Sequence, residues 1–329
     1  MEAQSVREAM NRCAGAGRPF LFGVDFELRE GFFVENPCGE AATDIRFVCG
    51  AAGNACGPEP GEHSAEGRIE IVRSDRAAYL RRFDRIRRGL LRGDTFLANL
   101  TERTPVRCDL SLEEIFRRTQ ARYKLLLPGR AVCFSPECFV RIEQGRIRSF
   151  PMKGTIDASR PGAEAELLAD YKETCEHRTI VDLIRNDLSR VADRVRVERF
   201  RYVEPIATSR GEILQTSSEI VGTLRAGWRE RLGDIVFGLL PAGSISGAPK
   251  EATLRLIREA EQRPRGFYTG VFGYFDGRDL DSGVLIRYLE QDAGGLWFRS
   301  GGGITVHSDP QAEYDEVLTK IYLPLADVE

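Results

Sequence analysis

The sequence predicts a globular fold that mixes helices with strands and lacks the regular period of a nucleotide-binding βαβ array. Two observations lead to this class. Apolar residues recur at helical spacing in some segments and alternate or form short runs in others. The 329 residues, 42% hydrophobic and 29% charged, are enough to bury a sizeable core. Composition leaves one large domain or two smaller ones open, and no repeat or linker divides the chain.

The N-terminal part is expected to form short strands and then an amphipathic helix. The best strand candidates are Phe20 to Leu28 and Ile45 to Cys49. A stretch rich in Gly and Pro, Ala51 to Gly67, predicts a surface loop. Beyond it, apolar residues recur at steps of four, three and four and share one helix face, namely Tyr79, Phe83, Ile86 and Leu90.

The middle of the chain predicts strands around two helices. Ser111 to Glu114 has the form of a capping box and should open a helix. A long helical segment is expected from Ala163 to Leu188. The remaining segments have strand-like patterns, namely Thr95 to Leu100, Ala131 to Ile142, Arg146 to Phe150 and Val195 to Phe200.

The last third predicts a helix, three strands and a closing helix. Pro249 can occupy the first turn of a helix that runs to about Gln262. Proline has no backbone N–H, and the N–H groups of the first turn have no partner within the helix, so nothing is lost there. The closing helix should begin at Ala312. Between these helices lie three strand candidates, Gly270 to Phe275, Gly283 to Leu289 and Trp297 to Ser300.

Charge and cysteine usage argue against several classes of partner. The 47 basic and 50 acidic residues nearly cancel and are interspersed, so no nucleic-acid partner is expected. Eight cysteines without Cys-x-x-Cys spacing, beside three histidines, favour reduced thiols over disulfides or a sulfur-bound metal. No signal peptide and no apolar run of membrane-spanning length is apparent, which predicts a cytoplasmic protein without a membrane partner.

Two pairs of glutamates could hold a metal ion. Glu173 with Glu176, and Glu313 with Glu316, have i, i+3 spacing, so each pair shares one face of a helix. Two such faces turned toward each other would offer hard oxygen ligands for Mg²⁺. For a single pair, a solvated acidic face is the better interpretation. Lys320, on the same face as the second pair, favours a metal bound together with an anion.

Two further residues could carry chemistry. Lys153 lies between a strand and Gly154, where it is either a surface side chain or, in a cleft, an amine that desolvation makes neutral and nucleophilic. Glu137 follows Pro136 at the end of an apolar stretch. Burial would keep it protonated as a general acid, and a rim carboxylate paired with an arginine is an equal alternative. The glycine-rich segments at 243–250 and 301–305 can approach anions, but they match no phosphate-binding motif.

Taken together and in order, these segments resemble the chorismate-utilising enzymes, which include anthranilate, aminodeoxychorismate, isochorismate and salicylate synthases. The similarity covers the chain from about Thr95 to Lys320, and residues 1–70 match poorly and are shorter than is usual. The matching stretches are Ser135-Pro136-Glu137, Pro151 to Thr155, Glu176 to Leu188, Pro241 to Lys250, Tyr268 to Tyr274, Ile286-Arg287 and Gly301 to Ile304.

The resemblance implies a fold and a set of roles. It implies one chorismate-binding catalytic domain over residues 1–329, with a core at 95–320, in which two antiparallel sheets stack in an α+β fold with helices outside. Glu137 and Lys153 are then the catalytic residues. The metal ligands for Mg²⁺ would be Glu173, Glu176, Glu313 and Glu316. The substrate-binding residues would be Thr155, Ser246, Gln215, Tyr268, Arg287, Gly302, Gly303 and Lys320.

Lys153 narrows the activity that the resemblance implies. Anthranilate and isochorismate synthases usually have alanine there, whereas lysine is similar to the aminodeoxychorismate synthases. In those enzymes the amine attacks C2 of chorismate as the 4-hydroxyl leaves, and ammonia then adds at C4 and expels the lysine. Leu97, where isochorismate and salicylate synthases place a lysine, argues against those two activities.

Two positions depart from the family pattern. Relatives that use ammonia often carry glutamine where Leu97 stands, so an ammonia pocket here would be built differently. Many relatives have histidine where Gln215 stands, and glutamine can donate a hydrogen bond but cannot carry a proton at neutral pH.

The resemblance also implies a partner and leaves alternatives. Ammonia would come from a glutamine amidotransferase subunit, because no Cys/His glutaminase motif is apparent. The product would be 4-amino-4-deoxychorismate, a precursor of 4-aminobenzoate and folate. The alternatives are an anthranilate synthase and a non-catalytic subunit that activates a glutaminase.

Overall fold

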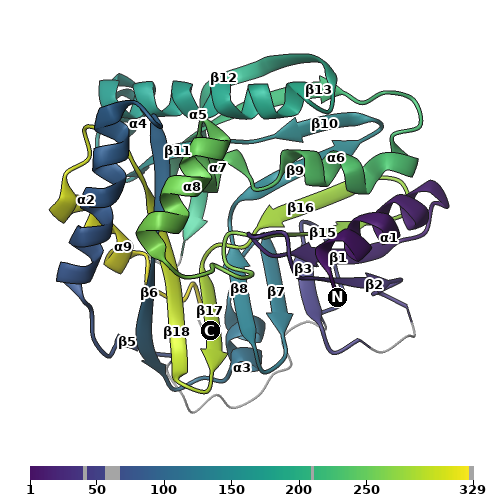
Figure 1. The fold of residues 1–329 in the computed structure, drawn as a ribbon, viewed down its shortest axis with the longest axis horizontal. Coiled ribbons are helices and arrows are strands. Elements are labelled where there is room, and N and C mark those ends of the chain that lie inside the picture. Colours follow the sequence, from purple (N-terminus) through teal and green to yellow (C-terminus); the bar gives the residue numbers. More distant parts are fainter. Residues whose placement is uncertain (40–42, 56–66, 209–210, 326–329) are drawn as a thin grey trace.

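The protein is built from two antiparallel sheets that face each other, with helices on the outer side of each (Figure 1). The computed structural model describes residues 1–39, 43–55, 67–208 and 211–325. The predicted surface loop falls mostly outside these described residues. This architecture confirms the α+β fold with two stacked sheets.

The first sheet contains, in the described ranges, nine strands, all antiparallel to their neighbours. Its spatial order is β11 (Met152–Asp157), β13 (Gly211–Thr223), β10 (Arg146–Ser149), β9 (Cys138–Glu143), β16 (Leu280–Val284), β15 (Val271–Phe275), β1 (Phe20–Val24) and β2 (Gly31–Glu35). The ninth strand, β12 (Asp193–Thr208), pairs with the other side of β13.

The second sheet is also antiparallel, again with nine strands in the part of the chain that the structure covers. Its order is β14 (Gly247–Ala248), β6 (Leu97–Cys108), β18 (Gly295–Ile304), β17 (Tyr288–Asp292), β8 (Ala131–Ser135), β7 (Tyr123–Leu127), β3 (Arg46–Cys49) and β4 (Ala52–Gly53), with β5 (Ile69–Ile71) beside β6. Residues 1–70 thus contribute strands to both sheets.

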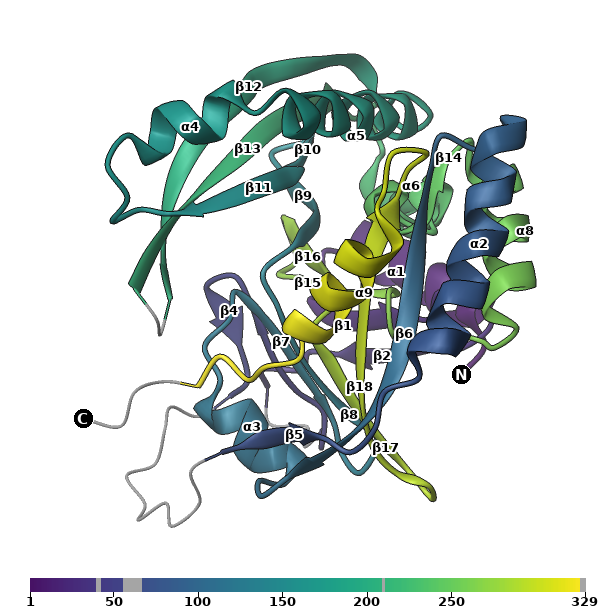
Figure 2. The ribbon, with the colours of Figure 1, turned by 90° about the vertical axis from the view of Figure 1, so that its left-hand side faces the viewer.

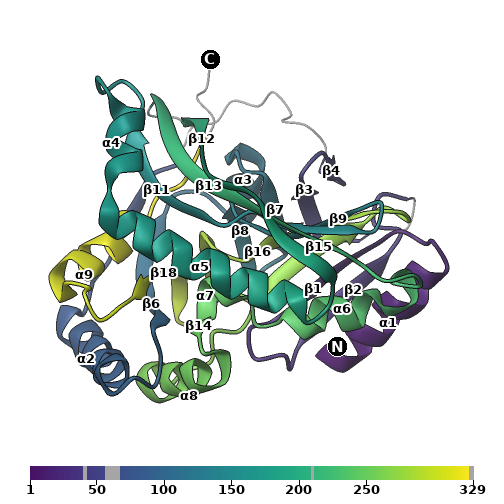
Figure 3. The ribbon, with the colours of Figure 1, turned by 90° about the horizontal axis from the view of Figure 1, so that it is seen from above.

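Helices cover the outer faces of the sheets. Over the first sheet lie α1 (Ala3–Gly15), α4 (Ala163–Ala169), α5 (Tyr171–Ser189) and α6 (Leu232–Leu239). Against the second lie α2 (Arg76–Arg92), α3 (Leu112–Arg118), α8 (Lys250–Glu261) and α9 (Pro310–Thr319), with the short α7 (Gly243–Ser246) between β6 and α5. Figure 3 shows α5 running across the molecule and α2, α8 and α9 gathered at one end.

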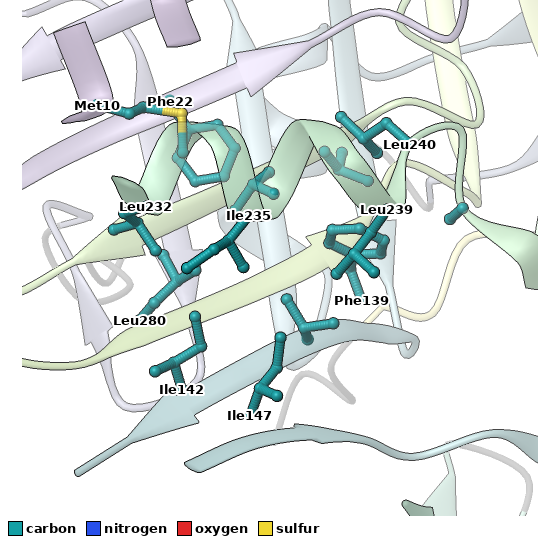
Figure 4. Close-up of a cluster of buried hydrophobic side chains, with 14 of the residues drawn as sticks. Met10, Phe22, Phe139, Ile142, Ile147, Leu232, Ile235, Leu239, Leu240 and Leu280 are labelled. Carbon is teal, nitrogen blue, oxygen red and sulfur yellow. The ribbon is translucent and has the colours of Figure 1, made fainter. Parts of the chain in front are cut away.

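Apolar side chains fill the spaces between these layers. Met10 of α1 and Leu232, Ile235 and Leu239 of α6 pack on the first sheet, where Phe22 meets them (Figure 4). A separate cluster lies between the two sheets and joins side chains such as Phe272 of one to Tyr123 of the other. Burial of these side chains stabilises the layered arrangement that positions the site described below.

Several expected elements are confirmed, together with the local chemistry that predicts them. The predicted face of α2 is buried at Tyr79, Phe83, Ile86 and Leu90. Asp75 caps the start of α2 by accepting a hydrogen bond from the Ala78 amide, and Gly93 ends it in the left-handed conformation. The capping box at Ser111 and Glu114 is present at α3.

Other boundaries were wrong. The strand expected from Gly283 to Leu289 is two strands, β16 and β17, because the chain leaves one sheet and enters the other between them. The long helix breaks at Asp170, whose extended backbone ends α4 and whose side chain caps α5. Pro249 precedes α8 as its N-cap. The N-terminal helix α1 was missed, since only strands were expected there.

Two further expectations concern thiols and membranes. The seven cysteines within the described ranges are all free, which agrees with reduced thiols. No helix in those ranges combines the length and the apolar character needed to cross a bilayer.

A buried ion pair joins the segments that carry the site. Arg265 is 1% exposed and donates to Glu261, 2.8 Å away, to the carbonyl of Ile245 at 2.9 Å and to the carbonyl of Asn99 at 2.7 Å. The Glu261 carboxylate also accepts a hydrogen bond from the amide of Thr101. This network fixes α7 and β6 to the end of α8.

We expect Arg265→Met to lower the free energy of unfolding by about 3–5 kcal/mol, because it leaves the Glu261 carboxylate buried without its cation. Urea unfolding measures the change. Arg263→Met is the control, since Arg263 is exposed and should change stability by no more than about 0.5 kcal/mol. Equal stability of the two variants would contradict the role of the pair.

Candidate active site

A cavity of about 670 Å³ lies where the two sheets and their helices meet. Its walls come from β11 and α5 on one side and from β6, β18 and α9 on the other (Figure 2). The turn after β8, the segment 244–246 and the segment 286–287 close it. The volume falls within the range of small-molecule sites.

Most of the predicted site residues line this cavity. They are Glu137, Lys153, Glu176, Ser246, Tyr268, Arg287, Gly302, Gly303, Glu316 and Lys320. Residues from all seven matching stretches therefore converge on one space, as the resemblance implies. Thr155 and Gln215 are cross-strand partners on β11 and β13, and the structure does not place them among the residues that line the cavity.

Lys153 extends from β11 toward α5. Its Nζ lies 2.8 Å from Glu176 Oε2, and its side chain is 31% exposed. Burial alone would lower the pKa of Lys153, but the charges of Glu176, Glu173 and Glu316 outweigh burial and raise it above the ordinary value. The expectation that burial makes this amine neutral is therefore wrong for the ion-paired arrangement. The amine must lose a proton before it can act as a nucleophile.

Helix α5 is fixed behind Lys153 by a buried histidine. His177, next to Glu176, is fully buried, and its Nε2 lies 2.6 Å from the hydroxyl of Ser218 on β13. Burial, together with Arg201 and Lys153, lowers the pKa of His177 to about 4, so the ring is neutral near pH 7. This contact sets the position of the Glu176 carboxylate relative to β11.

Glu137 lies between β8 and β9 with its carboxylate in the cavity. Oε1 accepts a hydrogen bond of 2.6 Å from the hydroxyl of Ser244. Burial raises the pKa of Glu137, while the Ser244 hydrogen bond and the charges of Arg287 and Lys320 oppose the increase. The group therefore favours the protonated form more than an ordinary glutamate does, which suits a general acid.

We expect Ser244→Ala to move the titration midpoint of Glu137 to higher pH, because the hydrogen bond from Ser244 stabilises the carboxylate. Infrared difference spectroscopy of the carboxyl group during a pH titration measures the midpoint, and Glu137→Gln identifies the band. A midpoint that stays in place or falls in Ser244→Ala would contradict this assignment.

The four glutamates occupy two different helices. Glu173 and Glu176 lie on α5, and Glu313 and Glu316 lie on α9. Their carboxylates are the hard oxygen ligands that suit Mg²⁺. In the described part of the chain, no three acidic, His or Cys side chains lie close enough together to hold an ion. One member of each pair instead contacts a lysine, since Lys320 Nζ lies 2.6 Å from Glu316 Oε1.

The glycine-rich strand β18 forms the wall next to α9. Lys320 donates to the carbonyl of Gly301 at 2.8 Å, which places its ammonium beside the strand. A Cβ at Gly302 would lie 3.3 Å from Glu313 Oε2, tighter than an ordinary contact. Glycine at this position therefore lets the carboxylates of α9 approach the backbone that lines the cavity.

Two residues that line the cavity have uncommon backbone conformations. Thr269 has φ of 62° and Arg287 has φ of 51°, the left-handed region that non-glycine residues seldom occupy. Such strain concentrates at functional sites because the surrounding structure must hold it. Tyr268 is 3% exposed, and Ser246 is fully buried with its hydroxyl bonded to the carbonyl of Ala242.

Sequence reasoning missed three residues of this cavity. Ser244 was read only as part of a glycine-rich turn, although it bonds Glu137. Thr269 was noted only as part of the stretch Tyr268 to Tyr274, because its strain depends on the path between β15 and the preceding helix. Asn99 lies on the same side of β6 as Leu97, and its buried Oδ1 has no hydrogen-bond partner among the described residues. Because residues two apart on a strand face the same side, the position of Asn99 two residues after Leu97 could have identified it.

The comparisons with known proteins agree with this geometry. The model of the chorismate binding enzyme family matches residues 40–326. An uncharacterized PabA-like protein of Pasteurella multocida is 47% identical over 326 residues, which cover 99% of this chain and 100% of that protein. The aminodeoxychorismate synthase component 1 of Salmonella typhimurium is 31% identical over 262 residues, 75% of this chain and 56% of the relative.

Among solved structures, anthranilate synthase component I of Streptococcus pneumoniae is similar, with a TM-score of 0.62 and 26% identity. The match covers 77% of this chain and 58% of that one. The named relatives thus include both kinds of chorismate aminase.

Proposed function

We propose that this chain, which belongs to the chorismate binding enzyme family, is an aminodeoxychorismate synthase component that converts chorismate and ammonia to 4-amino-4-deoxychorismate. The observation that carries the proposal is the amine of Lys153 in the cavity, beside Glu176 and in the same space as Glu137. The similarity to the aminodeoxychorismate synthase component 1 of Salmonella typhimurium supports the same proposed function.

The composition of the chain strengthens the argument from Lys153. Only five of the 47 basic residues are lysines, yet two of the five, Lys153 and Lys320, line this cavity. A guanidinium could make the ion pair with Glu176 equally well. An arginine cannot be deprotonated near neutral pH, so a lysine is needed where the side chain must act as a nucleophile.

In the proposed reaction two bonds change at each of two steps. The deprotonated amine of Lys153 forms a bond to C2 of the ring while the bond from C4 to its hydroxyl breaks, and Glu137 donates the proton that lets this group leave as water. The proton that Lys153 must lose can pass to Glu176, 2.8 Å away. Ammonia then bonds to C4, and the bond between C2 and Lys153 breaks.

The cavity can balance the charge of a dianionic substrate. Arg287 and Lys320 lie on its walls, and the backbone of Gly302 and Gly303 offers a close approach. The glutamates on α5 and α9 add negative charge, which a Mg²⁺ ion would offset together with the charge of a substrate carboxylate. Glu173, Glu176, Glu313 and Glu316 would hold the ion only after their carboxylates draw together, because no three of them lie close enough to share it in this structure. The source of ammonia is, in this proposal, a glutamine amidotransferase subunit.

The product identifies the reaction. We expect incubation with chorismate, Mg²⁺ and an ammonium salt to yield 4-amino-4-deoxychorismate, detected by liquid chromatography and mass spectrometry. Anthranilate, formed with release of pyruvate, would overturn the proposal in favour of the other aminase. If chorismate remained unchanged even after a glutamine amidotransferase was added, the result would favour a non-catalytic subunit.

A further inference from the structure

A second cavity, of about 750 Å³, lies on the α2 side of β6 and β18 and shares no lining residue with the candidate active site. Its walls come from α2, the segment 101–105 of β6, the end of α8 and the inward side of α9. Seven arginines line it, Arg73, Arg81, Arg82, Arg85, Arg103, Arg263 and Arg299. The acidic residues on its walls are Asp75, Glu102 and Glu261.

Within the described ranges, acidic groups pair with only three of these seven arginines, Arg82, Arg103 and Arg299. Glu102 forms an ion pair with Arg82, and Glu261 is held by Arg265, which lies outside the cavity lining. Asp75 caps α2. Glu290 and Asp292 pair with Arg103, and Glu290 also lies 3.4 Å from Arg299.

Four cavity arginines therefore have no carboxylate partner among the described residues, namely Arg73, Arg81, Arg85 and Arg263. The helix beside them adds to the positive field, since α2 carries seven arginines and one aspartate. Such a field raises the local concentration of anions and steers them toward the cavity.

Buried hydroxyl groups and an aromatic wall complete the cavity. Thr104 and Tyr314 are 2% and 5% exposed, and their hydroxyl oxygens have no hydrogen-bond partner among the described residues. Buried hydroxyl groups are normally satisfied, so such groups in a polar cavity indicate a missing partner. The Arg103 guanidinium stacks on the Trp297 ring at 4.1 Å, which holds it against one wall.

We propose that this cavity binds a small molecule with at least two oxyanion groups, of the phosphorylated-metabolite class. Arginine forks bind phosphate and carboxylate oxygens through paired hydrogen bonds, and the volume matches small ligands. The arginine cavity and the candidate active site share α9 as a wall. Tyr314 and Leu318 of α9 line the arginine cavity, whereas Glu316, and Lys320 just beyond the helix, line the other.

The test is titration calorimetry of the full chain with inorganic pyrophosphate in the presence of EDTA. The variant Arg81→Gln/Arg263→Gln removes two exposed cavity arginines. The control, Arg88→Gln/Arg92→Gln, removes the same charge from exposed positions of α2 outside the cavity. We expect saturable binding by the natural protein, a Kd raised at least tenfold by the first variant, and a change of less than about threefold in the control.

Four outcomes would overturn the proposal. One is the absence of saturable binding, and another is equal weakening in both double variants, which indicates only a diffuse field. A third is binding that survives Arg81→Gln/Arg263→Gln but is lost in Lys320→Gln, because the anion would then occupy the other cavity. Saturation by an acidic peptide without binding of pyrophosphate would also reject the small-molecule ligand. None of these results depends on the reaction proposed above.

Discussion

Replacing Lys153 by alanine is expected to slow chorismate amination by at least roughly 10³-fold, as the loss of a catalytic nucleophile does in other enzymes. The amine is the group that forms the bond to C2 in the proposed reaction, and it lies 2.8 Å from Glu176 Oε2. The rate of product formation at saturating chorismate and ammonium measures the change. Turnover equal to that of the natural protein would remove Lys153 from the mechanism.

A conservative variant separates the nucleophile from the ion pair. Lys153→Arg keeps a positive charge next to Glu176 but offers no neutral amine, so we expect it to be as inactive as Lys153→Ala. Calorimetry should show that chorismate still binds to Lys153→Arg. If Lys153→Arg were active and Lys153→Ala were not, the side chain would act only through its charge.

Replacing Glu137 by glutamine is expected to lower the amination rate by roughly 10²- to 10⁴-fold, the usual contribution of a positioned general acid. Glutamine keeps the size of the side chain and can accept the hydrogen bond from Ser244, but it has no acidic proton to give to the leaving hydroxyl. The same product assay measures the loss, and chorismate binding should persist.

Glu143→Gln is the matched control for this change. Glu143 lies on the same strand as the residues that follow Glu137, and its side chain is 46% exposed in ion pairs with Arg141 and Arg148. We expect the amination rate of Glu143→Gln to stay within about twofold of the rate of the natural protein. An equal loss in both variants would indicate damage to the strand instead of a missing acid.

The elements that sequence predicts best are those with strong local signals. The apolar face of α2 and the capping box at Ser111 depend on residues within one or two turns, so periodicity and capping identify them. The division between β16 and β17 depends on which sheet each strand joins, a long-range choice that alternation cannot report. Helix α1 was missed although its buried residues Val6, Met10 and Cys13 recur at helical steps of four and three, because only strands were expected in the N-terminal part.

The site could be predicted as a set of residues but not as an electrostatic arrangement. Resemblance alone brought together Glu137, Lys153 and Arg287, and the cavity contains all three. The pKa of Lys153 could not be predicted, because its direction depends on the distance to Glu176 and on the charges across the cavity from it. The hydrogen bond from Ser244 to Glu137 likewise joins segments more than a hundred residues apart.

The intact mass of the protein after incubation with chorismate and Mg²⁺, without ammonia, tests the covalent role of Lys153 most directly. The proposed reaction predicts a gain equal to chorismate less one water, carried on the peptide that contains Lys153 and released when ammonium is added. The same experiment on Lys153→Arg should show no gain. A natural protein that turns over chorismate with ammonium but forms no such adduct, even with rapid acid quenching, would contradict the covalent mechanism.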